Sequence, residues 1–149
     1  MVKGSLNVFG INHKISFRKV FFKNILSFSY QSQENLKQNM TGGVTGLVNR
    51  QLIYKYPSLR FSSSLTYKFN NRLTMESGIV LSDLSYNLKD NRLGSKNVLF
   101  NYLNDDGGTN FFQVYAQLLA KLSTKIKTTI GLHQYKFLLN DATAIEPRW

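Results

Sequence analysis

The sequence predicts an all-β protein built as an antiparallel up-and-down meander of long strands. The clearest sign is the alternation from residue 59 to residue 69, where every second position except Ser63 is apolar and the residues between them are polar. Successive side chains of a strand point to opposite faces, so this segment predicts a sheet with one apolar and one polar face.

The length of that pattern and the spacing of the connections are two further signs. An alternation of about eleven residues exceeds the five or six of an ordinary strand and equals what a tilted strand needs to cross a bilayer. Short polar turns alternate with connections of about twenty residues, which are uncommon in compact domains. We therefore expect part of a transmembrane β-barrel, about six strands plus a stub, with short turns at one end and long loops at the other.

The first hairpin is expected from residues 7–17 and 20–31. A short turn at Arg18 and Lys19 joins the two strands. From residue 32 to residue 57 the alternation gives way to polar and glycine-containing sequence, which predicts a long connection.

The second hairpin has the most regular pattern in the chain. Its strands are expected at residues 59–69 and 73–88, with a polar turn at residues 70–72. A second long connection is expected at residues 89–108, which carry a tract of two aspartates and two glycines typical of turns.

The third hairpin is expected at residues 112–122 and 126–133. Apolar residues hold every even position of its first strand, and residues 123–125 form the turn. A further connection begins at Asn140 and leads to the stub. The whole chain, 1–149, is thus expected to be one partial outer-membrane β-barrel domain.

Composition narrows the function classes. The net charge is +11, but the basic residues are scattered and the most regular apolar face carries none, which argues against a nucleic-acid partner. There is no cysteine, and each of the two histidines stands alone, so we expect no metal site and no cofactor. No paired carboxylates or nucleophile motif occur at useful spacing, so we expect no enzyme and no catalytic residues.

The amino terminus has no apolar stretch of the kind that forms a signal peptide, and no segment has the eighteen apolar residues of a membrane helix. An exported barrel without its signal is expected to be a fragment of something longer.

The last forty or so residues resemble the barrel of Bacteroidetes-type TonB-dependent receptors. The family has a strand of the form aromatic-x-x-Tyr-Ala-Gln, a periplasmic turn, a Gly-Leu-His strand, a Leu-Asn-Asp loop and a Glu-Pro-Arg strand start. The matching segments are Phe112-Gln113-Val114-Tyr115-Ala116-Gln117, Gly131-Leu132-His133, Leu139-Asn140-Asp141 and Glu146-Pro147-Arg148.

The resemblance implies a fragment of an outer-membrane barrel of about twenty-two strands that imports a bulky nutrient with energy from TonB. It also implies outer-membrane lipid, a plug domain and TonB as partners of the full-length parent. Since the chain has no plug domain and no signal peptide, we do not expect it to function alone.

Specificity in such a barrel would come from side chains that face the lumen, and their excess positive charge would favour anionic solutes. The candidates are Arg60, Lys68, Glu76, Gln113, Gln117, Lys121, Lys127 and His133. The same two-faced strands also fit an alternative, a soluble β-barrel or sandwich that binds a small ligand or partner.

Overall fold

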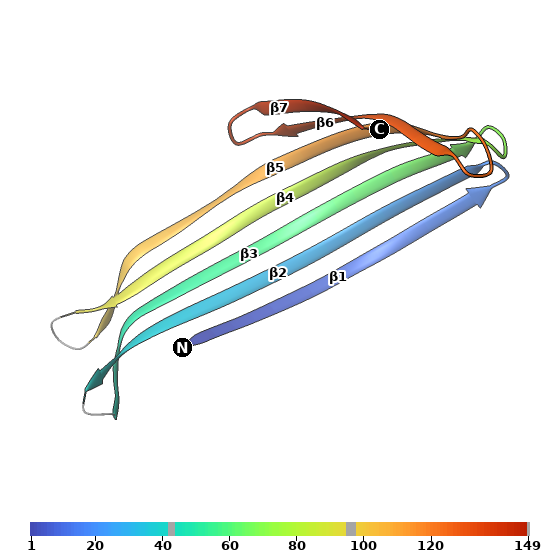
Figure 1. Ribbon diagram of the computed structural model, residues 1–149. Helices are drawn as coiled ribbons and strands as arrows, with labels where there is room; N and C mark the ends of the chain where they lie inside the picture. Colours follow the sequence, from blue (N-terminus) through green and yellow to red (C-terminus); the bar gives the residue numbers. More distant parts are fainter. Residues whose placement is uncertain (42–43, 95–97, 149) are drawn as a thin grey trace. The chain divides into compact units, whose positions relative to one another are not determined.

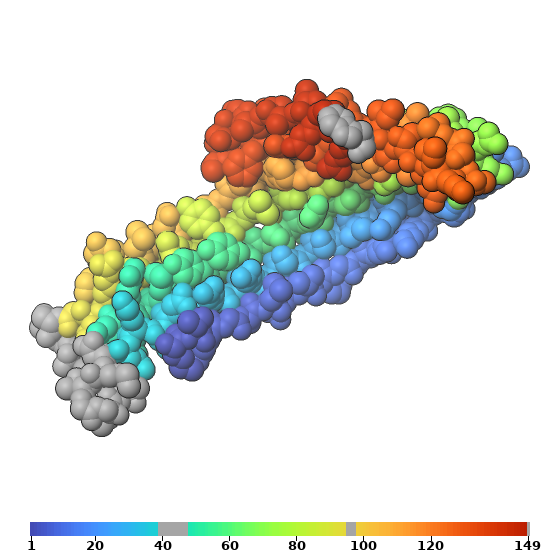
Figure 2. Space-filling view, viewed as in Figure 1, coloured from blue at the N-terminus to red at the C-terminus, as the bar shows by residue number. Residues whose placement is uncertain are grey.

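The computed structural model describes residues 1–41, 44–94 and 98–148 (Figure 1). Its described residues form an antiparallel meander in which strands adjacent in sequence are adjacent in the sheet, as the colour bands of Figure 2 also show. The strands are β1 (Val2–Phe17), β2 (Val20–Thr41), β3 (Val44–Lys68), β4 (Leu73–Leu93), β5 (Leu99–Lys121), β6 (Lys127–Phe137) and β7 (Ala142–Arg148). The predicted fold class, with a short final strand, is confirmed.

The three short turns fall where the sequence predicts them. Arg18 adopts a left-handed backbone with φ of 49° between β1 and β2. Between β3 and β4, Asn70 Oδ1 accepts the N–H groups of Arg72 and Leu73, both at 2.8 Å. Ser123 Oγ accepts two backbone N–H groups in the same way between β5 and β6.

The two long loops were a wrong prediction. Residues 32–41, 44–57, 89–93 and 99–108 belong to strands, so β2 to β5 run well beyond the apolar alternation. Polar side chains hold these parts of neighbouring strands together, as the ion pair of Arg50 with Asp90 illustrates. The glycines at 42–43, expected in the first loop, lie outside the described residues.

The chain divides into two compact units, each described here by itself. Unit 1 comprises Met1–Val8, Ser29–Ser58 and Leu84–Gly108. Unit 2 comprises Phe9–Phe28, Leu59–Asp83 and Thr109–Trp149. Unit 2 contains the three turns described above, the turn between β6 and β7, and nearly all of the alternating sequence.

The register of unit 2 sorts its side chains by polarity. Ala116 lies opposite Leu132 and Leu118 opposite Ile130 in the β5–β6 pair, so their side chains share one face. Tyr115 lies opposite His133 on the other face. We call these the apolar face and the polar face of unit 2.

Burial in unit 2 is the reverse of that in a soluble sheet protein. His133 on the polar face is 8% exposed, whereas its neighbour Leu132 on the apolar face is 53% exposed. In the same way Ser82 is buried and the adjacent Leu81 is exposed. Val80 is the one buried apolar side chain among the described residues, and it lies on the polar face between Gly78 and Ser82. The apolar side chains of unit 2 therefore do not form a closed core.

Candidate functional site

The polar face of unit 2 carries a hydrogen-bonded cluster around Glu76. Gln117 Nε2 donates to Glu76 Oε2 at 2.9 Å, and the Tyr115 hydroxyl donates to Glu76 Oε1 at 3.4 Å. Glu76 comes from β4 and the two donors from β5, where they are two positions apart and so point the same way. The structure thus joins two predicted candidates, Glu76 and Gln117.

A second cluster surrounds His133 on the same face. Arg148 Nη2 lies 3.3 Å from His133 Nδ1, and because a guanidinium can only donate, this ring nitrogen is the acceptor. Glu146 Oε2 is 3.8 Å from the same nitrogen, and Tyr135 donates to the other oxygen of Glu146 at 3.4 Å. The clustering follows from the β6–β7 register, in which His133 lies opposite Glu146 and Gly131 opposite Arg148.

Gln113 borders the His133 cluster, and the other predicted candidates lie at other positions of unit 2. The Lys68 ammonium lies 4.7 Å from the centre of the Phe21 ring. Lys121 lies opposite Lys127 at the turn end of β5 and β6, and Gln113 lies opposite Tyr135. The carbonyl of Arg60 accepts a long bond of 3.5 Å from Ser27 Oγ.

Sequence reasoning missed Tyr115, Glu146 and Arg148 as site residues. Tyr115 had a usable signal, since it stands between Gln113 and Gln117 at the spacing of two that puts all three on one face. No signal in the sequence marks Glu146 and Arg148 as site residues, because their partners depend on how β7 pairs with β6.

A separate polar cluster lies in unit 1. The Arg50 guanidinium donates two hydrogen bonds of 2.8 Å to the two carboxylate oxygens of Asp90. The Arg92 guanidinium donates two more, of 3.0 and 3.1 Å, to Asp90 Oδ2. The Arg92 guanidinium also lies 3.5 Å from the centre of the Tyr102 ring. Asp90 is only 2% exposed, and the two guanidinium groups compensate the burial of its charge.

The hydrogen bond from Arg50 holds the pKa of Asp90 below its usual range, and this effect outweighs the desolvation that would raise the pKa. The same bond raises the pKa of Arg50. Next to this cluster, Gln51 donates to Glu34 at 2.6 Å and accepts from Asn91 at 3.0 Å. These side-chain bonds link β2, β3 and β4 in addition to the backbone pairing of the strands.

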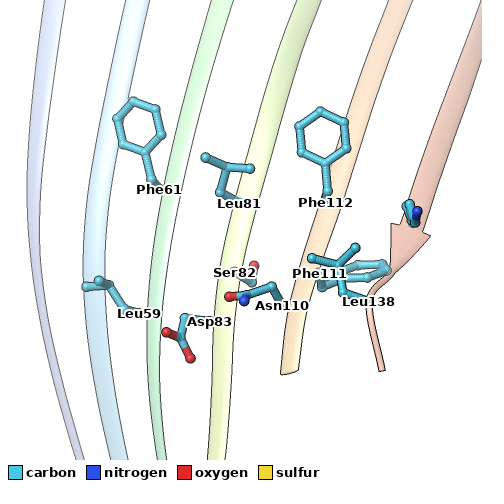
Figure 3. Close-up of a pocket in the computed structure, with 10 residues that line it drawn as sticks. Leu59, Phe61, Leu81, Ser82, Asp83, Asn110, Phe111, Phe112 and Leu138 are labelled. Atoms are coloured by element: carbon cyan, nitrogen blue, oxygen red, sulfur yellow. The ribbon is translucent and has the colours of Figure 1, made fainter. Parts of the chain in front are cut away.

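On the apolar face of unit 2 a shallow hollow of about 500 Å³ marks a change in side-chain character. Figure 3 shows Phe61, Leu81 and Phe112 side by side on β3, β4 and β5, with Asp83 and Asn110 at the next positions along their strands. The apolar side chains of β4 and β5 therefore end together.

No group of three or more histidine, aspartate or glutamate side chains suited to a metal ion occurs within the part of the chain that the structure describes. Residues 1–41, 44–94 and 98–148 also contain no helix long and apolar enough to cross a membrane. In comparisons with known proteins, no protein-family model matches the chain, and no curated protein sequence matches it.

Proposed function

We propose that the chain forms part of the transmembrane β-barrel of an outer-membrane receptor that takes up a bulky nutrient, as in the TonB-dependent receptors that its last forty or so residues resemble. The observation that carries the proposal is the reversed burial of unit 2. A sheet that exposes its apolar face and covers its polar face suits a surrounding of acyl chains and a lumen of water.

The size of the apolar face agrees with this assignment. About eleven residues at about 3.3 Å each give a strand of about 35 Å, and a tilt of about 45° reduces this to about 25 Å along the membrane normal. That equals the height of the apolar band of outer-membrane barrels. The change from Leu81 to Asp83 and from Phe112 to Asn110 fits the rim of such a band (Figure 3).

The edges of the sheet imply further strands. β1 and β7 are first and last in the hydrogen-bonded order, and lipid cannot satisfy an open strand edge. In the proposed parent barrel, additional strands pair with both. Outer-membrane lipid covers the apolar face, a plug domain and TonB complete the receptor, and the nutrient passes along the polar face.

Reconstitution tests the proposal with two neighbouring substitutions. The full chain is refolded into zwitterionic lipid vesicles, where the open edges of several copies can pair with one another, and the fraction of unit 2 protected from added protease is measured. Val114→Arg places a cation on the apolar face, which costs about 2–4 kcal/mol at the membrane midplane, so protection should be largely lost. Gln113→Arg is the matched control, because it adds the same charge to the polar face and should leave protection intact.

Two results would refute the proposal. One is equal loss of protection for Val114→Arg and Gln113→Arg. The other is a wild-type chain that stays monomeric at high concentration in buffer without detergent, which would favour a soluble β module instead.

A further inference from the structure

The polar face of unit 2 has a strongly basic hollow at its turn end, which we call the turn-end hollow. Its volume is about 350 Å³. Four of its lining residues are cationic and none is acidic. The lining residues are Arg18, Lys19, Lys68, Asn70, Asn71, Thr74 and Lys121.

The cations come from three different strand ends, so the fold gathers charges that are distant in sequence. The Lys19 ammonium donates to the Phe69 carbonyl at 3.1 Å, which directs it toward the next turn. Lys68 lies over the Phe21 ring. Neither contact supplies a negative charge. Four like charges around one small volume repel each other, and a bound anion would relieve that repulsion.

The neutral lining residues favour the same kind of ligand. Asn70 Oδ1 already accepts two backbone N–H groups, so the group that Asn70 has left for a ligand is its amide N–H₂ donor. Asn71 and Thr74 can also donate. The turn-end hollow therefore offers donors and cations together, the combination that binds phosphate oxygens.

We propose that the turn-end hollow binds a soluble anion that carries phosphate groups, and that such an anion is the solute class of the polar face. This inference rests on the proposed function, because it takes the polar face as the lumen. A lipid phosphate is the other source of the same chemistry, but the hollow opens on the polar face, opposite the side chains assigned to acyl chains.

The test measures binding of inorganic pyrophosphate to the full chain refolded into vesicles of zwitterionic lipid. Titration calorimetry should show saturable binding for the wild type. Lys68→Gln combined with Lys121→Gln should weaken it about tenfold to twenty-five-fold, since each exposed cation contributes about threefold to fivefold. The matched control removes the same charge from unit 1 with Lys55→Gln and Lys89→Gln and should change affinity less than about twofold.

A single substitution tests the same site in case the double variant does not fold. Arg18 has φ of 49°, which glycine adopts without strain, so Arg18→Gly removes a lining charge while it favours the turn. It should weaken pyrophosphate binding by about threefold to fivefold with unchanged circular dichroism.

The outcomes separate this inference from the proposed function. Protease protection without pyrophosphate binding, or equal weakening by the two double variants, overturns the phosphate site and leaves the barrel proposal standing. Binding to vesicles of anionic lipid that Lys68→Gln with Lys121→Gln weakens, without pyrophosphate binding in zwitterionic vesicles, would point to lipid phosphate as the ligand and would also overturn it. Equal loss of protease protection for Val114→Arg and Gln113→Arg overturns the barrel proposal itself.

Discussion

The ring of Tyr115 lies directly over Gly78. A β carbon built at Gly78 would come within 2.7 Å of three atoms of that ring, including the hydroxyl oxygen. The glycine thus provides the space in which Tyr115 lies flat across β4, with its hydroxyl directed to Glu76.

Gly78→Ala should therefore destabilise unit 2. The methyl group needs space that the ring occupies, and overpacking of this kind costs about 1–3 kcal/mol of unfolding free energy. The measurement is guanidinium unfolding in detergent micelles, followed by circular dichroism.

Gly10→Ala is the matched control for this substitution. A β carbon there meets atoms no closer than 3.5 Å, which is ordinary contact. Because alanine also restricts the unfolded chain, Gly10→Ala should be neutral or stabilising by up to about 1 kcal/mol. A Gly78→Ala protein as stable as Gly10→Ala would contradict the close approach of Tyr115.

The Tyr115–Gly78 contact also shows how far the sequence could predict the site. Alternation assigns Glu76, Gly78, Tyr115 and Gln117 to polar faces, because period two needs only local sequence. That Tyr115 crosses to Gly78 depends on the pairing of β4 with β5, which alternation alone does not determine.

The long strands of unit 1 were missed for a different reason. Residues 32–41 and 89–93 have polar residues on both faces, so hydrophobic periodicity gives no signal there. Their pairing depends on particular polar partners, such as Gln51 with Asn91, and those partners are 40 residues apart in the chain.

The Asp90 cluster predicts a pH dependence of stability. The folded pKa of Asp90 lies below its unfolded value of about 4, so its contribution is complete above that value and is lost as the pH falls through the folded pKa. The urea midpoint should therefore decrease between about pH 5 and about pH 2. Asp90→Asn should lower the midpoint at neutral pH and flatten this part of the profile.

Asp106→Asn is the control for the pH experiment. Asp106 is an exposed carboxylate of the same unit, so Asp106→Asn should show the same dependence of the urea midpoint on pH as the wild type. If Asp90→Asn kept the full decrease below pH 5, other carboxylates would have to be responsible.

Replacement of Thr109 by valine should stabilise the protein. Its hydroxyl oxygen is buried and has no hydrogen-bond partner among the described residues. Thr109→Val keeps the shape and removes the unpaired group, which should raise the unfolding free energy by about 1 kcal/mol. Ser29→Ala is the contrasting case, since Ser29 Oγ bonds Ser58 Oγ at 2.8 Å, and it should lower stability by about 0.5–1.5 kcal/mol. A destabilised Thr109→Val protein would mean that the hydroxyl has a partner, such as a bound water.

Asn70 allows the turn and the turn-end hollow to be tested separately. Asn70→Ala removes the acceptor for the N–H groups of Arg72 and Leu73, which should cost about 1–2 kcal/mol of unfolding free energy. Asn70→Asp keeps a side-chain oxygen at that position, so the turn should stay intact. The new carboxylate, however, enters the lining of the turn-end hollow and replaces a donor by a negative charge. Asn70→Asp should therefore unfold like the wild type and bind pyrophosphate at least about tenfold more weakly, whereas equal affinity in the two proteins would show that pyrophosphate binds elsewhere.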